Sequence, residues 1–309
     1  MRLLTTACLG ILLTSPQLAH GQVLLKFKIV EGLTSTLVTE AESNQTLTIA
    51  GMEVVSASTQ KRTVESSNGR RNPDGTIHVE QVFKALEADL SLPGGIELQF
   101  DSANPDAPRP GTQADFLLDI LNATSKSTWT MIYSADGRVV AVEGGKKTLD
   151  SLDERTQELV AKQFDPEYLK DQANTQLDLF PATPVSEGDT WRRSSDVRLE
   201  AGQSLSFTTD YEYIGTVKTS AGKELDRIAV HVKEVSYDID EDAPTPLRIT
   251  DSALKIENAE GEILFDREVG QIVQQNDKVR ITGDITFSVS GNELPGKVDL
   301  TMHNRVKRS

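Results

Sequence analysis

The sequence predicts an α+β protein, mostly antiparallel β, with a curved sheet or half-barrel, about three helices, and two halves that can be read as related. Three observations predict this class. Apolar and polar residues alternate along much of the chain, glycine-containing turns separate several of these runs, and apolar residues take helical spacing in two regions. Strands that alternate in this way have one wet face and belong to antiparallel sheets.

The clearest strand lies at 277–289. Val279, Ile281, Ile285 and Phe287 share one parity there, and charged or polar residues occupy most of the other. Shorter runs of the same kind stand at 25–29, 77–83, 96–100, 205–213, 228–232 and 298–302. Each is therefore expected to form a strand with one buried face.

Two acidic-glycine pairs indicate hairpins. Asp136-Gly137 lies between the apolar runs WTMIYS and RVVAV, and Glu260-Gly261 lies between ALKIEN and EILFD. Glycine adopts the positive φ that tight hairpin turns require, so a turn is predicted at each pair.

Helical spacing appears first at 113–123, after the proline-rich loop NPDAPRPG. It appears again at 150–179, where Asp165-Pro166 interrupts the pattern. Proline is tolerated in the first turn of a helix, so this region is expected to hold two helices joined at Pro166.

The predicted organisation has four parts: a signal peptide at 1–21, an N-terminal β half with one helix at 22–145, a helical pair and linker at 146–184, and a C-terminal β half at 185–309. The signal rests on Arg2, a short apolar run and the small residues around His20, with cleavage expected before Gln22. We expect a periplasmic or secreted protein. Cys8 leaves with the signal, so disulfides, zinc thiolates and a thiol nucleophile are excluded from the mature chain.

The strongly negative net charge of the chain argues against some classes of binding partner. The formal net charge is −15, and the acidic residues are scattered. Nucleic acids and anionic membranes attract clustered lysine and arginine, so neither is an expected partner. No integral membrane segment and no cofactor are expected, and the oligomeric state is left open.

The stretch PVSEGDTW holds two weak candidate ligand-binding residues, Asp189 and Trp191. In the functional interpretation Asp189 is an acid or base beside an aromatic wall. In the structural interpretation, which we favour, a strand begins here, Trp191 covers the end of the sheet and Asp189 accepts from backbone amides of the turn. Alternation points His78 and His231 outward, and solvated histidine is also expected at His303. No serine-elbow, P-loop or dinucleotide motif occurs, so no catalytic residue is assigned.

The acidic run at 238–242 offers weak candidates for a metal. Asp238, Asp240 and Asp242 supply hard oxygen ligands of the kind that calcium prefers. The sharp-turn glycine and the bidentate glutamate of an EF-hand loop are missing, because Ala243 and Ile249 stand in their places. A solvated turn is favoured and no metal is assigned.

Several segments taken in order resemble a known family. NATSKSTWTMIYSADGRVVAVEGG comes first, PVSEGDTW follows the helical pair, and GEILFDREVGQIVQQNDKVRITGD comes last. This order is similar to an uncharacterised family of secreted bacterial proteins, the domain of unknown function 6263. The resemblance implies secretion and a β-rich body, and it brings no defined catalytic or binding residue.

Three functions stay open on the sequence. The first is an exported, non-catalytic binding or structural protein, including a carrier that holds an apolar ligand between a curved sheet and its helices. The second is an envelope hydrolase that uses carboxylates, with Asp189 or the cluster near Asp240 in its cleft. The third is a module that binds an envelope protein by adding a strand at a sheet edge.

Overall fold

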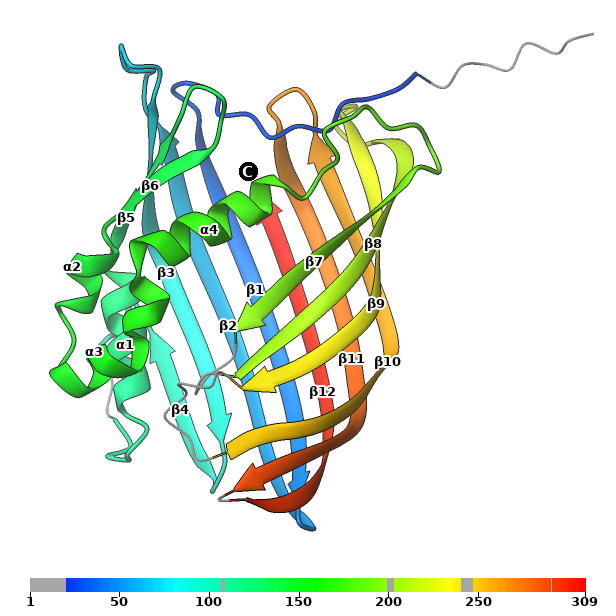
Figure 1. Cartoon of the computed structure of the whole chain (residues 1–309). Coiled ribbons are helices and arrows are strands. Elements are labelled where there is room, and N and C mark those ends of the chain that lie inside the picture. The colour runs from blue at the N-terminus through cyan, green and yellow to red at the C-terminus, as the bar shows by residue number, and fades with distance from the viewer. Residues whose placement is uncertain (1–20, 107–108, 199–202, 240–246, 290) are drawn as a thin grey trace, which may run out of the picture.

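One antiparallel sheet of twelve strands organises the part of the chain that the structure describes. A computed structural model describes residues 21–106, 109–198, 203–239, 247–289 and 291–309. The sheet runs in the order β6-β5-β3-β2-β1-β12-β11-β10-β9-β8-β7, and β4 pairs with the lower part of β3 beside this path. The sheet bends into an open half-barrel whose concave face looks toward the helices (Figure 1). The expected fold class is confirmed.

The N-terminal half contributes β1 (Thr34–Ile49), β2 (Met52–Asn68), β3 (Ile77–Leu92), β4 (Ile96–Asp101), β5 (Thr128–Tyr133) and β6 (Val139–Glu143). The C-terminal half contributes β7 (Thr190–Arg198), β8 (Gln203–Lys218), β9 (Glu224–Ile239), β10 (Leu247–Asp266), β11 (Gln271–Val289) and β12 (Asn292–Arg308). The two halves meet where β1 pairs with β12. The sheet thus runs through both predicted β segments, while the boundaries proposed for them stay a prediction.

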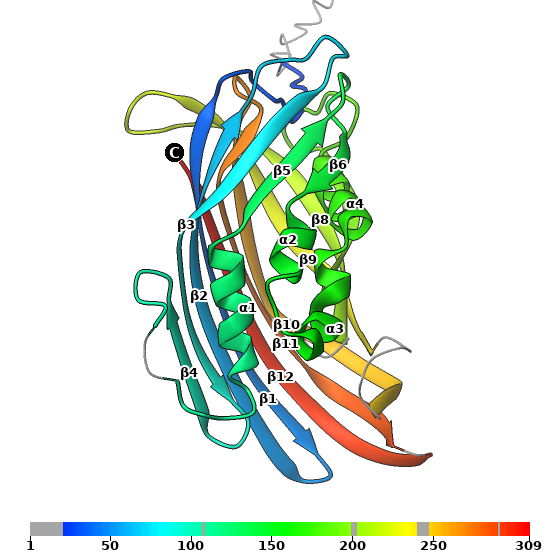
Figure 2. The same ribbon diagram turned by 90° about the vertical axis from the view of Figure 1, so that its left-hand side faces the viewer.

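The helices are α1 (Phe116–Ser125), α2 (Gly145–Leu149), α3 (Glu154–Val160), a 3-10 turn η1 (Ala161–Phe164) and α4 (Pro166–Leu177). They lie on the concave side, toward the β3–β6 edge (Figure 2). The predicted helix pair around Pro166 is confirmed, because Asp165 caps α4 by accepting from the Tyr168 amide at 2.9 Å and Pro166 is its first residue.

The predicted hairpin at Glu260-Gly261 is wrong. Both residues lie inside β10, which continues for 20 residues with three bulges. The space around Gly261 explains the glycine: a Cβ there would stand 2.7 Å from the Val230 Cβ and 2.8 Å from Asp277 Oδ1. Glycine serves close packing at this position rather than a turn. By contrast, the Asp136-Gly137 turn between β5 and β6 is confirmed.

The strand predicted at 25–29 is also wrong. Residues 22–30 belong to no strand and make one isolated bridge, between Val23 and Val185, and a turn at 31–32 then leads into β1. Leu25 is buried, and Phe27 stacks on Phe180 with ring centroids 5.1 Å apart. The alternation was therefore a packing pattern, in which apolar side chains fill the upper end of the C-terminal half without a neighbouring strand.

Candidate functional site

The concave face is identified by the strand register. Residues directly opposite one another in paired strands point to the same face. Following the pairs across the sheet places Leu47 of β1, Val298 of β12 and Ile281 of β11 on one face. The same face carries Leu86 of β3 and Ile263 of β10. Among the described residues, all the sheet members of the apolar clusters lie on this face.

The lower part of the concave face is apolar over the C-terminal half. Its buried members come from β8, β9, β11 and β12: Leu205, Phe207, Tyr237, Ile239, Val279, Ile281, Ile285, Phe287, Val298 and Leu300. Around them lie apolar side chains that are only partly buried, among them Leu47, Ile49, Leu254, Ile256 and Leu294. Met52 at the end of this region is 69% exposed. We call this region of buried and partly buried apolar side chains the apolar floor. Its buried members pack against one another, and its partly buried members present apolar surface to solvent.

The central part of the same face is polar over β1 and β2. From Thr39 to Gln45, β1 presents Thr39, Ala41, Ser43 and Gln45, and β2 presents Ser56, Ser58, Gln60 and Arg62 opposite them. Ala41, Gln60 and Arg62 are exposed although they face the inside of the curve. Side chains of the described residues therefore leave this part of the concave face open to solvent.

The charges on this face are few. Among the inward-facing residues of β1, β2, β3, β11 and β12, the charged side chains are Arg62, Arg308 and Asp277. Except for Asp277, the carboxylates on these strands point to the convex face, as Glu40, Glu42 and Asp299 do. Apart from Asp277, the inward-facing positions of these five strands are thus neutral or basic.

The carboxylate of Asp277 is packed closely against Gly261 of the neighbouring strand β10. Its Oδ1 lies over Gly261 without a hydrogen-bond partner, and its Oδ2 accepts from Gln275 Nε2. Burial raises the pKa of Asp277 from its usual 3.8 to about 6, and the Gln275 bond only partly offsets this. Burial also raises the pKa of neighbouring Tyr211 to about 12, with a further contribution from the negative charge of Asp277.

We expect Asp277→Asn to remove a pH dependence of stability. Because the folded-state pKa is raised, the wild type is stable while Asp277 is protonated and loses stability as pH rises from about 4 to about 6. The variant, equal at pH 4, should be more stable at pH 8 by about 2 kcal/mol, allowing for the solvent that reaches this face. Urea unfolding across this pH range measures the difference, and identical curves for the two proteins at all pH values would contradict it.

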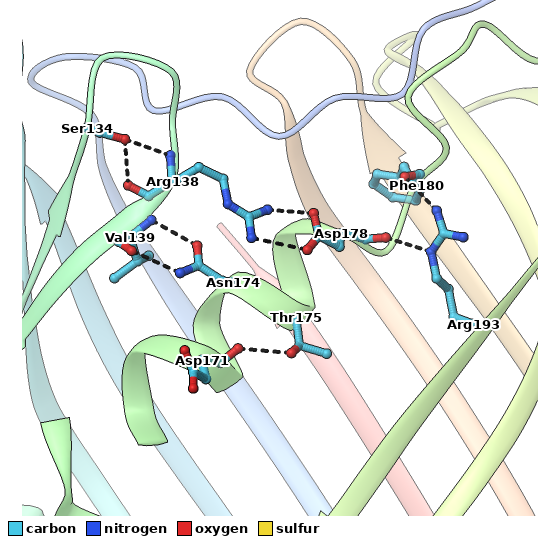
Figure 3. A network of polar contacts seen from close by, with 9 residues as sticks. All are labelled: Ser134, Arg138, Val139, Asp171, Asn174, Thr175, Asp178, Phe180 and Arg193. Atoms are coloured by element: carbon cyan, nitrogen blue, oxygen red, sulfur yellow. Dashed lines mark hydrogen bonds and ion pairs between the residues drawn. The ribbon is translucent and has the colours of Figure 1, made fainter. Parts of the chain in front are cut away.

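Helix α4 bridges the two edges of the sheet (Figure 3). Asn174 donates to the Val139 carbonyl at 2.9 Å and accepts from the Val139 amide at 3.0 Å, which satisfies both backbone groups of Val139 at the edge strand β6. At the end of the helix, Asp178 pairs with Arg138. From the opposite edge, Arg193 of β7 donates to the carbonyls of Asp178 at 2.6 Å and Phe180 at 3.0 Å. Helix α4 and the residues that follow it, 166–180, therefore form a strap across the upper concave face, and this strap contacts both edge strands, β6 and β7.

The predicted residues of PVSEGDTW lie at the end of this strap. Asp189 accepts from the Ser186 amide at 2.7 Å, so it does cap the turn, and β7 begins at Thr190. Trp191 is buried, donates to the Leu179 carbonyl at 2.9 Å and stacks on Tyr211 at 5.8 Å. Both residues thus have structural partners, and a ligand-binding role for either stays a prediction.

The other predicted groups do not gather into a site. Asp238 accepts from the amide of Ile239, whereas Asp240 and Asp242 lie outside the described residues, as does the signal peptide up to His20. In the part of the chain that the structure describes, no cluster of three metal-ligating side chains is present. His78 and His231 are exposed as expected, and His303 is half-buried on the convex face, where it contacts Arg305.

Sequence reasoning missed Arg62, Arg308 and Asp277. Around Arg62 the sequence reads TQKRTVE, with polar residues on both parities, so no alternation indicates which side chains face inward. Arg308 stands in the similarly charged RVKRS near the C-terminus. Asp277 does share parity with Val279 and Ile281, and this break in an apolar stripe was the one available signal.

No helix in the described residues is long and apolar enough to cross a membrane. Two surface depressions lie on the convex face, one around Thr46, Thr282 and Asp299 and the other around Asn44, Val55 and Arg280. Neither gathers chemically complementary groups as the concave face does.

Comparison with known proteins gives a family and distant structural neighbours. Residues 74–221 match the profile of a family of unknown function (DUF6263). No curated protein matches the chain. A lipovitellin structure titled for its lipid–protein interactions has 8% identity and a TM-score of 0.37, over 91% of this chain and 25% of that one. This chain thus spans about a quarter of that protein.

Two further structures are more distant. An outer membrane channel from Pseudomonas putida F1 has 9% identity and a TM-score of 0.20, over 91% of this chain and 97% of the other. A DUF1329 family protein from Desulfovibrio piger has 8% identity and a TM-score of 0.12, over 88% and 85% of the two chains. At such TM-scores these likenesses assign no function.

Proposed function

We propose that this chain, whose residues 74–221 match the profile of a family of unknown function (DUF6263), binds a long-chain apolar ligand on the concave face of its sheet. The observation that carries the proposal is the partly exposed apolar floor, formed by Leu47, Ile49, Leu254, Ile256 and Leu294 around the buried cluster. Apolar surface of this kind is favourably removed from water by an apolar chain laid along it.

The arrangement of the helices supports this use of the face. They pack on β3, β4 and β6, and α4 crosses the upper part, so the lower floor of β10–β12 and β1 lies beyond them (Figures 1 and 2). A ligand can therefore enter from the lower end while the upper end is filled by the cluster around Leu25, Phe180 and Phe265.

Magnitudes favour a long chain. Burying one methylene group contributes about 0.8 kcal/mol, whereas association costs on the order of 4–15 kcal/mol. A short apolar molecule would not repay that cost. The floor is long enough for more, because its apolar run from Val279 to Phe287 spans about 26 Å of β11 at 3.3 Å per residue.

Export remains part of the proposal. The signal expected at 1–21 would deliver the carrier to the periplasm or the medium, where apolar molecules need a protein to cross water. Fractionation of the source cells checks this part separately, and a chain retained in the cytoplasm with residues 1–21 intact would overturn it.

The hydrolase alternative finds less support in the geometry. Two carboxylates flanking a substrate are the usual arrangement for glycoside hydrolysis. The inward-facing described residues of β1–β3, β11 and β12 offer Asp277 without a second carboxylate beside it. The binding function is therefore the one that the concave face supports best.

We expect Val54→Glu to weaken the binding of a fluorescent long-chain probe by at least about tenfold. Val54 is half-buried and opposes Leu47 on the apolar floor, so a carboxylate there places a charge where the chain should lie. Its neighbour Val55, 58% exposed on the convex face, supplies the matched control Val55→Glu. Fluorescence titration measures both variants, with circular dichroism to confirm that they fold.

Native mass spectrometry of protein purified from its own source complements the titration. We expect an added mass that is lost on delipidation. Absence of any bound mass, together with no probe binding by the wild type, would overturn the proposed function. Equal loss in Val54→Glu and Val55→Glu would show that binding does not use the concave face.

A further inference from the structure

Arg62 differs from the arginines of the convex face. There Arg192, Arg227 and Arg280 each pair with a carboxylate of a neighbouring strand, namely Asp210, Glu262 and Asp299. Arg62, on the concave face, makes no hydrogen bond or ion pair with any described residue. The Arg62 side chain is exposed to solvent by its surface area. Protein atoms of the surrounding half-barrel still displace part of the water around the guanidinium, and this desolvation lowers its pKa. Arginine nevertheless remains charged at any physiological pH. The concave face thus holds an unneutralised cation.

Arg308 adds a second positive charge on the other side of β1. Arg62 opposes Thr39 and Arg308 opposes Leu37, so the two arginines flank one strand on the same face. Their Cα atoms are separated by two strand spacings, about 10 Å, and by two residues along the strand, about 7 Å. Arg308 donates to Ser35 Oγ at 2.9 Å and to the Ile272 carbonyl at 3.3 Å, which holds its guanidinium beside Ser35, four residues before Thr39 on β1. Arg308 therefore adds to the positive potential of this face, while Arg62 is the arginine that stays available for an anion on the polar strip.

Carboxylates do not compensate these charges locally. The inward-facing positions of β1, β2, β3 and β12 carry none among the described residues, and Asp277 of β11 opposes Asn304 rather than either arginine. The polar groups nearest in register to Arg62 are neutral, namely Thr39 across β1 and Gln60 along β2. A protein of net charge −15 therefore keeps a small basic region inside its curve.

We propose that Arg62, assisted by Arg308, receives the anionic head group of the ligand, so that the protein binds long-chain amphiphiles with a carboxylate or phosphate head. This inference rests on the proposed function. The chain would lie along the apolar floor below, and the head would reach the polar strip of β1 and β2. Guanidinium groups bind both head groups through paired, charge-assisted hydrogen bonds, which are stronger where water is partly excluded.

The test compares ligands of one chain length. Dodecanoate and dodecyl phosphate carry the anionic head, 1-dodecanol lacks the charge, and inorganic phosphate lacks the chain. We expect the full chain to bind the two anions at least about tenfold more tightly than 1-dodecanol, as one charge-assisted hydrogen bond allows. Inorganic phosphate should bind far more weakly. Whichever of the two anions binds more tightly identifies the head group.

Arg62→Gln should abolish the preference for the anions and leave the affinity for 1-dodecanol unchanged. Arg62→Lys, which retains the charge without the forked donors, should keep part of it. Arg280→Gln removes an arginine from the convex face and should change nothing. In the wild type, added salt should weaken dodecanoate binding and spare 1-dodecanol, a readout that needs no variant.

Each contrary result has a separate meaning. Equal affinity for dodecanoate and 1-dodecanol, unchanged in Arg62→Gln, overturns the head-group assignment while the apolar floor stands. Phosphate binding as tightly as dodecyl phosphate overturns the assignment to an amphiphile. Failure of all three long-chain probes overturns the proposed function itself.

Discussion

Asp226→Ala is expected to lower the free energy of unfolding by about 3 kcal/mol. Asp226 is 1% exposed and accepts from Tyr213 Oη at 2.8 Å and Arg267 Nε at 2.8 Å. Removing the carboxylate leaves the Tyr213 hydroxyl buried without its partner and the Arg267 charge unpaired. The loss falls at the lower end for a buried pair, because the Arg267 side chain is 40% exposed and can turn to water. Urea denaturation at pH 7 measures it.

Two further variants separate the contribution of the Asp226–Arg267 ion pair from that of the hydrogen bond to Tyr213. Asp226→Asn retains an acceptor for Tyr213 and should cost less than Asp226→Ala. The double variant Asp226→Ala with Arg267→Ala should be less destabilised than the sum of the two single variants, because neither then leaves a charge behind. Strict additivity would show that the ion pair contributes nothing.

Trp191→Ala should destabilise the protein by about 4 kcal/mol, the usual cost of emptying a buried aromatic position. Trp191 stacks on Tyr211, meets Phe180 edge-on and donates to Leu179 in the linker that follows α4. Its loss should therefore loosen the strap from β7 as well as open a cavity. Thermal unfolding gives the stability, and hydrogen exchange of the 178–191 amides reports the strap.

Val197→Ala, on the same strand but 39% exposed, is the matched control and should cost less than about 1 kcal/mol. Asp189→Ala should cost about 1 kcal/mol through the lost bond to the Ser186 amide and leave dodecanoate affinity unchanged. A large drop in affinity with little loss of stability in either Trp191→Ala or Asp189→Ala would instead favour the ligand-binding role considered for the pair.

The sequence indicated the fold where one face of a strand is dry. Val279, Ile281, Ile285 and Phe287 are all buried, as their shared parity predicted. The pattern misled where burial does not come from a sheet, as in the segment around Leu25. It also misled at Gly261, since a glycine that permits close approach and a glycine that permits a turn look alike in a sequence.

The candidate site was much harder to predict. Arg62 faces inward only because β2 pairs with β1 in one particular register, and both faces of that strand are polar in sequence. The pKa of Asp277 depends on burial against Gly261 and on the hydrogen bond from Gln275, and the pairing of β10 with β11 is what brings Asp277 and Gly261 together. Information of this kind resides in the register, which a single sequence does not display.

The side-by-side position of β1 and β12 bears on how the protein acquires its structure. Leu37 pairs with Arg308 and Ile49 with Gly296, so the middle of the sheet joins segments that lie 247 to 271 residues apart in the sequence. Such distant partners meet slowly, and the two halves cannot pair with each other before β12 has left the ribosome. Until that moment two long, unpaired strand edges are exposed to other chains, which makes newly made protein a natural client for chaperones.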